Sequence, residues 1–284
     1  EYSTFFIYEP KEREIFRLPY FPDRIVHHAV MNVLEPVWVS IFTADTYSCI
    51  KGRGIQAAAD KLRRVIDRDK PGCAYCLKID IRKFYPSIDH AILKRIVRRK
   101  IKDTRLLRLL DEIIDSADGL PIGNYLSQFL ANLMLAYFDH WVKETKRVKY
   151  YFRYADDIVV LHSDKRVLRA LLADFERYLN TELNLFVKDN KQIFPVAKDH
   201  KDRHGRGIDF LGYVFYHNET RLRKRIKQNF CRKVAKLRKR KKPIGEAQFM
   251  QAVAAWWGWT KHSDSEYFIN KLNKISPYEI KFKR

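Results

Sequence analysis

Two adjacent acidic residues in the middle of a β-prone segment constrain this chain more than any other feature. Asp156 and Asp157 lie between residues 150–154 and residues 158–161, which are rich in Tyr, Phe, Ile and Val. Those residue types favour strands, whereas Asp is depleted from strand interiors. The segment is therefore predicted to form a β-hairpin with both acids at its tip. Two like charges held side by side raise the energy unless a cation offsets them, so a bound cation is expected here.

A third carboxylate is predicted to end a separate strand. Residues 75–80 form a mostly apolar run that terminates on Asp80. Mg²⁺ prefers oxygen ligands and is often held through one or two carboxylates plus substrate phosphates. Two such ions about 3.5–4 Å apart stabilise both the attacking and the leaving oxygen in phosphoryl transfer. Asp80, Asp156 and Asp157 are therefore candidates for a metal-dependent nucleotidyl-transfer centre, although an Asp-Asp pair also occurs in plain turns.

The overall charge indicates a polyanionic partner. The 284 residues include 56 Lys and Arg against 34 Asp and Glu, which leaves a net charge of +22. Such an excess attracts polyanions, of which nucleic acid is the commonest. A ribosome-bound protein or one that binds an anionic membrane surface has a similar composition, so charge leaves these alternatives open.

Other sequence features bear on location. No apolar run approaches the roughly 18–20 residues of a membrane helix, and the first residues lack the basic and apolar regions of a secretory signal. Of the four cysteines, only Cys73 and Cys76 have metal-like spacing, and no second ligand pair completes a site. We therefore expect a protein of the reducing cytoplasm with no membrane partner.

The order of predicted elements indicates an α+β fold. Between Arg221 and Lys242 there are 13 Lys or Arg and no acid, and the apolar residues keep helical spacing. The other predicted elements are helices at residues 23–36, 89–101, 104–115, 123–141 and 165–183, one strand at residues 208–215, and a Trp-rich helix around residues 256–259. This order predicts one mainly antiparallel sheet with helical subdomains before and after it.

Several motifs resemble those of reverse transcriptases. Tyr154-Ala155-Asp156-Asp157 is similar to their Tyr-x-Asp-Asp box, and residues 78–88 resemble their first catalytic motif. Residues 210–213 resemble their primer-grip motif. Arg13 and residues 21–26 are similar to the opening motifs of the bacterial, group II intron-like branch. These stretches occur in family order and span nearly the whole chain, so chance is a poor explanation.

The resemblance implies a right-hand polymerase fold and an RNA-directed DNA polymerase. It places the fingers at residues 1–74, a first palm segment at 75–90, a fingers insertion at 91–118, the main palm at 119–218 and a helical thumb at 219–284. A primer 3′-OH would attack the α-phosphate of a dNTP. Asp80 and Asp156 would hold two Mg²⁺ ions, with Mn²⁺ as a substitute; Asp157 would support the site and the main-chain carbonyl of Ile81 would add a ligand.

The resemblance also assigns binding roles. Tyr85 would be the steric gate that excludes a ribose 2′-OH, while its neighbour Phe84 would lie in the core; a core position for Tyr85 is the alternative. Arg13 would clamp the incoming triphosphate, and Lys191 would protonate the departing pyrophosphate. The other predicted dNTP contacts are Lys11, Ile122 and Gln128. The predicted primer and template contacts are Phe210, Leu211, Gly212, Tyr213, Arg221, Arg223, Lys224, Arg225 and Lys227.

One motif indicates the branch of the family. Residues 119–128 resemble the template-side motif of diversity-generating retroelement reverse transcriptases, which carry Ile-Gly-x-x-x-Ser-Gln where intron enzymes usually carry a Gln-Gly variant. Ala155 departs from the Met of some members. Enzymes of this branch copy a template-repeat RNA and misincorporate opposite adenines, which diversifies a target gene by mutagenic retrohoming. Ile122 beside the nascent base pair is expected to loosen fidelity.

That branch also implies partners. We expect an RNA template, an RNA/DNA hybrid, dNTPs and a small, basic, helical accessory protein that forms an oligomer, in a bacterial or phage-encoded system. The chain would lack the N-terminal helical segment that these enzymes usually carry. A group II intron, retron or phage-defence reverse transcriptase is the alternative. A non-catalytic RNA-binding scaffold of the same fold is an alternative of another class, which the three intact aspartates disfavour.

Overall fold

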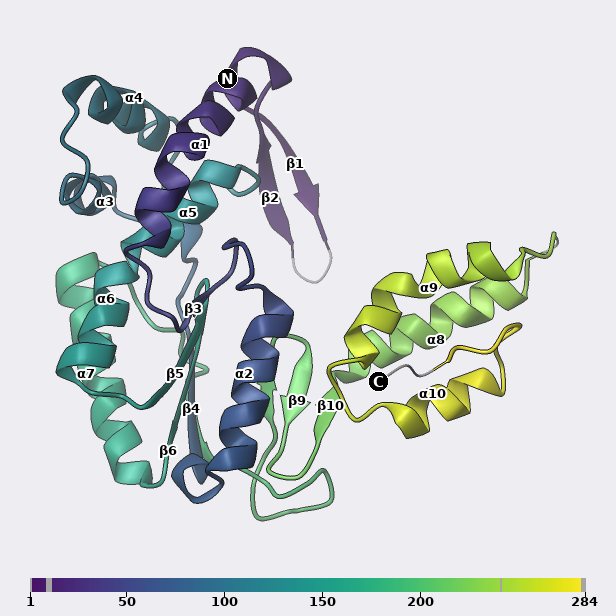
Figure 1. Ribbon diagram of the computed structural model, residues 1–284. Coiled ribbons are helices and arrows are strands. Elements are labelled where there is room, and N and C mark those ends of the chain that lie inside the picture. Colours follow the sequence, from purple (N-terminus) through teal and green to yellow (C-terminus); the bar gives the residue numbers. More distant parts are fainter. Residues whose placement is uncertain (1, 9–11, 241, 282–284) are drawn as a thin grey trace. The chain divides into compact units, whose positions relative to one another are not determined.

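The structure is a computed structural model that describes residues 2–8, 12–240 and 242–281 (Figure 1). The chain divides into two compact units, Glu1–Gly54 with Leu77–Ile193 and Ile55–Cys76 with Phe194–Arg284. Both units combine helices with strands, so the predicted α+β class is confirmed. The finer division into fingers, palm and thumb stays a prediction.

A five-stranded sheet carries the three candidate carboxylates. Its strand order is β3-β5-β6-β4-β7. The strands are β3 (Thr46–Tyr47), β5 (Tyr150–Tyr154), β6 (Asp157–His162), β4 (Tyr75–Asp80) and β7 (Gln192–Pro195). β5 and β6 form an antiparallel hairpin, and the short β3 runs parallel to β5. Residues 158–161 are all buried, which explains their continuous apolar sequence, because a strand covered on both faces does not alternate.

The first unit also contains a hairpin and several helices. The hairpin pairs β1 (Ser3–Ile7) with β2 (Arg13–Arg17). The helices are η1 (Tyr20–Arg24), α1 (Ile25–Val39), α3 (His90–Val97), α4 (Thr104–Ile114), α5 (Tyr125–Met134), α6 (Ala136–His140), η4 (Trp141–Thr145) and α7 (Lys165–Leu183), with the one-turn η3 (Tyr85–Ser87). The Phe138 and Phe175 rings lie 5.1 Å apart and join α6 to α7. Aromatic packing of this kind stabilises the helical layer.

Two predicted helix limits are wrong. Arg24, not Asp23, is the N-cap residue of α1, and its side chain makes no capping bond. Pro36 lies inside α1 instead of ending it, and Trp38, which is fully buried, lies in the turn after it. The single helix predicted for residues 123–141 is divided at Leu135, where φ is −99° and ψ is 0°. Apolar spacing continues across such a break, so periodicity alone does not reveal it.

The second unit is built on a small sheet followed by helices. It contains α2 (Ile55–Arg68) and η2 (Pro71–Cys73), and its three-stranded sheet has the order β10-β9-β8. The strands are β8 (Ile208–Phe210), β9 (Tyr213–Phe215) and β10 (Thr220–Leu222). Residues 208–215 were predicted as one strand, and this is wrong. Leu211 and Gly212 have φ values of 52° and 86° and form a two-residue hairpin loop.

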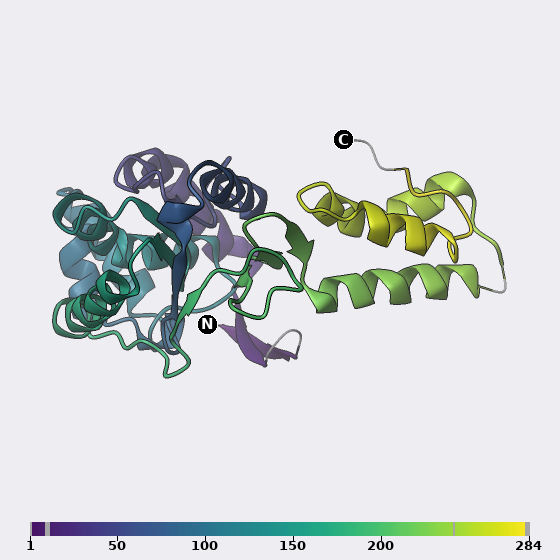
Figure 2. The ribbon, with the colours of Figure 1, turned by 90° about the horizontal axis from the view of Figure 1, so that it is seen from below.

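Three helices share a separate apolar core in the second unit. They are α8 (Lys224–Arg238), α9 (Glu246–Thr260) and α10 (Glu266–Asn273), which Figures 1 and 2 show packed together. Phe230, Phe249 and Ile269 are buried in this core, and Trp256 stacks on Phe230 with ring centroids 6.2 Å apart. The Trp-rich segment is helical, as predicted, and Trp256 and Trp257 pack against this core.

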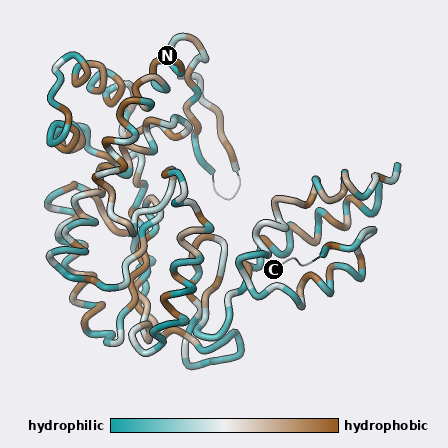
Figure 3. Tube along the Cα trace, viewed as in Figure 1, coloured by the Kyte–Doolittle hydropathy of each residue, from teal (hydrophilic) through white to brown (hydrophobic). Residues whose placement is uncertain are grey.

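Hydrophobic and hydrophilic residues recur in turn along the helices of both units (Figure 3). In α8 the apolar side consists of Phe230, Val234 and Leu237, which leaves its many basic residues on the remaining surface. Within the described residues, no helix combines the length and the apolar character that crossing a bilayer requires.

Candidate active site

The hairpin of β5 and β6 presents two acids at its tip, as predicted. Tyr154 pairs with Asp157, so Ala155 and Asp156 form the loop between the strands. Ala155 has a φ of 50°, in the left-handed region. Residues other than Gly, Asn and Asp rarely adopt this conformation. The backbone is thus held in an uncommon conformation next to the two carboxylates, and such strain is frequent at functional sites.

Backbone hydrogen bonds bring Asp80 to the same place. The Ile81 N–H donates to the Asp156 carbonyl oxygen at 3.3 Å, and the Lys188 N–H donates to the Asp80 carbonyl oxygen at 2.8 Å. A further bridge pairs Ile81 with Val187. The end of β4 therefore lies between the hairpin loop and residues 186–188, three segments that are far apart in the sequence.

Charge is unevenly balanced among these groups. Burial, and then the neighbouring Asp80 carboxylate, raise the pKa of Asp156 from 3.8 to about 6. The Lys188 ammonium lies 2.5 Å from Asp80 Oδ1, and the Lys78 ammonium lies 3.7 Å from Asp157 Oδ2. The two lysines partly offset three clustered acids, but burial and the Asp80 charge together still disfavour the ionised form of Asp156.

The donor set fits a divalent cation of the Mg²⁺ type. In the described ranges, no group of three His, Cys, Asp or Glu side chains is already arranged around a metal position. Asp80 and Asp156 nevertheless offer hard carboxylate oxygens, and their charges interact strongly. Mg²⁺ often takes only one or two carboxylates from a protein and completes its octahedron with water and phosphates. The Ile81 carbonyl remains a predicted ligand.

Tyr85 lies beside the carboxylates, whereas Phe84 is in the core. The Phe84 side chain is 3% exposed, as predicted. Burial raises the pKa of the Tyr85 hydroxyl, and the charges of Cys49 and Asp156 add to this effect while Arg13 opposes it. Arg13, Tyr85 and Asp156 therefore lie within electrostatic range of one another, although they come from β2, η3 and the hairpin loop.

The loop of residues 119–123 ties these segments together. The Leu120 N–H donates to the Tyr85 carbonyl oxygen at 2.9 Å, and the Phe16 N–H of β2 donates to the Ile122 carbonyl oxygen at 2.8 Å. Gly119 has a φ of 62°, and a Cβ there would lie 2.4 Å from the Tyr85 carbonyl oxygen. Only glycine allows both this conformation and this close approach. The half-buried Gln128 follows on the first turn of α5.

Two of the predicted nucleotide contacts are not placed at this centre. Lys191 is ion-paired with Glu176 of α7, and Lys11 lies outside the described residues. Lys188, to which no role was assigned from the sequence, contacts Asp80 instead. In the sequence, two lysines lie close together in segment 188–191, and this spacing does not show which of them contacts a carboxylate. Arg153 and Asp139, buried beneath the hairpin loop, were also missed.

The predicted primer contacts belong to the second unit. Phe210, Gly212 and Tyr213 are buried, so Leu211 is the one partly exposed residue of that motif. The Tyr213 hydroxyl donates to the Trp259 carbonyl oxygen at 3.3 Å, which fixes the loop on α9. Side chains of residues 210 and 213 thus support the loop instead of meeting a ligand.

The basic residues after this loop differ in their surroundings. Arg223 donates to Asp209 Oδ1 through Nε at 2.8 Å, so its charge is offset. Arg221 and Lys227 line a cavity of about 520 Å³ together with Lys201 and Tyr267. Burial, and then the Arg221 charge, lower the pKa of Lys227. Lys224 and Arg225 are exposed. Glu219 and Asp264 also line the cavity, but its basic residues outnumber these two acids, which favours an anionic ligand.

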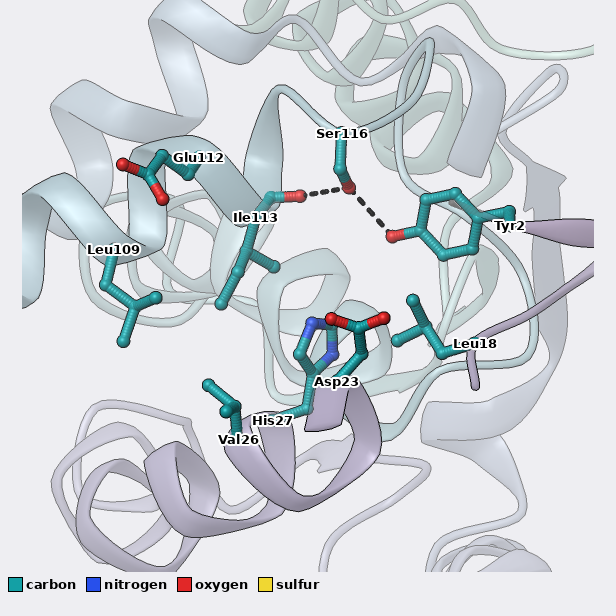
Figure 4. Close-up of a pocket in the computed structure, with 9 residues that line it drawn as sticks. All are labelled: Tyr2, Leu18, Asp23, Val26, His27, Leu109, Glu112, Ile113 and Ser116. Carbon is teal, nitrogen blue, oxygen red and sulfur yellow. Dashed lines mark hydrogen bonds between the residues drawn. The ribbon is translucent and has the colours of Figure 1, made fainter. Parts of the chain in front are cut away.

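A second cavity in the first unit involves none of the predicted residues. It has a volume of about 630 Å³ and lies among Tyr2, Asp23, His27 and α4 (Figure 4). The Tyr2 hydroxyl and Ser116 Oγ are 2.7 Å apart across it, and burial lowers the pKa of His27. We place the candidate chemistry at the carboxylates of the sheet instead, where the segments with the predicted catalytic motifs meet.

A family model confirms what the motifs suggested. The model of the reverse transcriptase (RNA-dependent DNA polymerase) family matches residues 10–215, which include all three carboxylates. The chain belongs to the reverse transcriptase family. Its similarity to the diversity-generating branch in particular is not shown by this match.

Curated relatives of this reverse transcriptase include bacterial intron and retron proteins. Protein YkfC of Escherichia coli K12 is 24% identical over 262 residues, with 76% of this chain and 67% of that protein covered. The group II intron-encoded protein LtrA of Lactococcus lactis is 26% identical over 140 residues, with 45% and 23% covered. The retron Ec73 reverse transcriptase of Escherichia coli is 31% identical over 165 residues, with 53% and 50% covered.

Solved structures show the same fold. Telomerase from Candida tropicalis, in complex with a fragment of telomeric RNA, matches with a TM-score of 0.61 at 12% identity. The match covers 98% of this reverse transcriptase and 55% of the telomerase chain, so this chain spans about half the length of that protein. The predicted polymerase fold is thereby confirmed.

Proposed function

We propose that this reverse transcriptase is an active RNA-directed DNA polymerase with a two-metal centre at Asp80 and Asp156. The observation that carries the proposal is the meeting of the β4 end with the hairpin loop, joined by the hydrogen bond from Ile81 to Asp156. This contact brings together two distant segments that each carry a carboxylate, which supports their proposed role as metal ligands. A scaffold that had lost catalysis would have no need for this costly arrangement of like charges.

The chain's own groups have distinct roles in the proposed reaction. Asp80 and Asp156 would hold the divalent ions, and Asp157 would support them. Mg²⁺, when bound, supplies a Lewis acid that stabilises charge on the attacking and leaving oxygens. Lys188 offsets the carboxylate charge while no substrate is present. Its ammonium would then donate a proton or a hydrogen bond to the departing pyrophosphate, the role that the sequence predicted for Lys191.

We expect Tyr85 to set the choice of sugar. Tyr85→Ala should lower the preference for dNTPs over rNTPs by about 10- to 100-fold, the range that one steric contact provides in substrate discrimination. Single-nucleotide incorporation with dGTP and rGTP measures the effect. Tyr85→Phe is the matched control, since it keeps the ring and should retain selectivity. An equal loss with both nucleotides would indicate a packing role for Tyr85 instead.

Unpaired basic residues of the second unit are proposed to hold nucleic-acid phosphates. Arg221→Gln and Lys227→Met should each reduce the magnitude of the slope of log K, the binding constant for nucleic acid, against log salt concentration by about 1. This is the change expected for the loss of one phosphate contact. Arg223→Gln should change the slope less, because Asp209 already offsets that charge. Fluorescence titration of an RNA/DNA hybrid at several salt concentrations measures this. Equal effects at all three positions would contradict the assignment.

The biological role within the family is a second level of the proposal. The intron- and retron-encoded relatives favour a group II intron, retron or phage-defence enzyme. The diversity-generating role is supported only by the motif of residues 119–128, and with it the template-repeat RNA and the accessory protein. All these enzymes share the polymerase chemistry. The carboxylates and the basic cavity of the second unit therefore do not distinguish the diversity-generating role from the intron, retron or defence role.

Primer extension on a defined RNA template, followed by sequencing of the cDNA, tests both levels. Mg²⁺-dependent extension supports the polymerase. Errors concentrated at template adenines would support the diversity-generating branch, and evenly spread errors would favour the intron, retron or defence role. Absence of extension with every RNA and divalent ion supplied would favour the non-catalytic scaffold.

A further inference from the structure

A fully buried ion pair lies directly beneath the catalytic loop. Arg153 of β5 and Asp139 of α6 are both 0% exposed. Arg153 Nε donates to Asp139 Oδ1 at 2.7 Å, and Arg153 Nη2 donates to Asp139 Oδ2 at 2.6 Å. This bidentate geometry is the strongest form of the Arg–carboxylate interaction. It fixes the guanidinium plane relative to the sheet.

The remaining donors of Arg153 are also used. Nη1 donates to Asn132 Oδ1 at 3.1 Å and to the Ala155 carbonyl oxygen at 3.0 Å, and Nη2 donates to the Asn132 carbonyl oxygen at 3.4 Å. A guanidinium has five N–H donors, so this one is fully satisfied. One of its bonds is therefore directed at the loop that carries Asp156.

Asp139 is anchored from three sides as well. Besides Arg153, it accepts from the Tyr151 hydroxyl at 2.6 Å and from Thr46 Oγ1 at 2.6 Å. Asn132 in turn donates to the Ser48 carbonyl oxygen at 2.9 Å. The network thus joins β3, α5, α6 and β5, elements that belong to the same unit.

Stability alone does not explain this network. Replacing a buried ion pair with uncharged residues of similar size is often neutral or stabilising, because removing two charges from water is costly. The Ala155 carbonyl, by contrast, belongs to the residue with a φ of 50° that immediately precedes Asp156. A donor fixed from below holds the Ala155–Asp156 peptide plane in this orientation, and rotation of that plane would redirect the Asp156 carboxylate.

We propose that Arg153, clamped by Asp139, is the positioning residue of the catalytic loop and fixes the direction in which Asp156 presents its carboxylate. The proposal rests on the polymerase function proposed above. Arg153 does not touch substrate; it acts through the Ala155 carbonyl. Groups that orient metal ligands in this way typically change metal affinity or activity by about 10- to 100-fold when they are replaced.

The double variant Arg153→Met with Asp139→Asn separates positioning from folding. It removes both buried charges together, and an Asn at 139 still accepts a hydrogen bond from Tyr151. We expect a melting temperature close to that of the wild type. We also expect Mn²⁺ affinity, measured by titration without nucleic acid, and kcat to fall about 10- to 100-fold, with KM for the template–primer unchanged.

Arg153→Lys is the second variant, in case the double variant does not fold. Lys keeps the charge opposite Asp139 but concentrates its donors on one atom, so it does not hold both Asp139 and the Ala155 carbonyl. The same losses of Mn²⁺ affinity and kcat are expected. A folded variant of either kind with wild-type Mn²⁺ affinity and kcat would overturn the proposal. If the wild type itself fails to extend primers, the polymerase proposal fails, whereas the Mn²⁺ titration still tests Arg153.

Discussion

Replacing Asp156 is expected to abolish polymerisation while making the metal-free protein more stable. Asp156→Asn removes a proposed metal ligand. Metal ions contribute several kcal/mol to phosphoryl transfer, so primer extension should fall by about 10³-fold or more. The same change removes a charge that the fold disfavours, because burial and Asp80 raise the pKa of Asp156 to about 6. Opposite changes in activity and stability would rule out misfolding as the cause of lost activity.

The sign of the stability change follows from linkage. The pKa of Asp156 is higher in the folded chain than the ordinary value of 3.8. The folded state therefore binds the proton more tightly, and stability is lost as the pH rises from about 4 through about 6. The gain from Asp156→Asn should be absent near pH 4 and present at pH 7, with EDTA in the buffer.

Thermal unfolding at the two pH values, alongside a primer-extension assay, measures these effects. Asp118→Asn is a suitable control, because Asp118 is exposed and outside the site; it should change neither quantity. Residual extension above about a tenth of the wild-type rate would contradict the role of Asp156 as a metal ligand. A variant with lower stability at pH 7 would contradict the electrostatic account of its surroundings.

Gly119→Ala is expected to have the largest structural effect of any single methyl group near the site. A Cβ at this position would lie 2.4 Å from the Tyr85 carbonyl oxygen and 2.7 Å from Pro86 C, both of which are backbone atoms. The left-handed conformation costs an L-residue about 1–2 kcal/mol, and overpacking adds about 1–3 kcal/mol. We expect a total loss of about 2–5 kcal/mol in the free energy of unfolding, with a raised KM for dNTPs because η3 carries Tyr85.

Gly52→Ala provides the matched control for Gly119. Gly52 also has a positive φ, of 76°, but a Cβ there would meet nothing within 4 Å. It should lose only the conformational part, about 1–2 kcal/mol, and keep the wild-type KM. Urea denaturation and steady-state kinetics of both variants measure the difference. Equal losses for the two would show that the contact between Gly119 and η3 is not tight in solution.

The elements that the sequence predicted correctly depend on short-range signals. α7 was predicted at residues 165–183 and occupies those residues, because Asp164 caps its start and Asn184, with a φ of 54°, ends it. The hairpin at Asp156-Asp157 follows from a local conflict between acidic residues and β propensity. The positions of the three acids were predicted for the same reason, since Asp80 ends β4 and Asp156 and Asp157 lie where β5 turns into β6.

Where the local signal was misleading, the fold decided otherwise. The Leu211–Gly212 loop divides a run that reads as one strand, because Gly212 accommodates close contact with Trp259 and Ile226. Pro36 continues α1 instead of ending it, since only one helical hydrogen bond is lost and the buried Trp38 holds the next turn. In both cases tertiary packing outweighed a local preference.

The sequence by itself determined the family, the α+β class and which carboxylates are candidates for the catalytic centre, because short motifs carry this information. Only the tertiary structure decided which basic side chains and which buried hydrogen-bonding residues surround these carboxylates. Lys188 reaches Asp80 through pairing of residues 80–82 with residues 186–188, and Arg153 meets Asp139 and Asn132 on other elements. Contacts between distant segments leave no periodicity in the sequence; they follow from how the strands of the sheet are paired and how helices cover it.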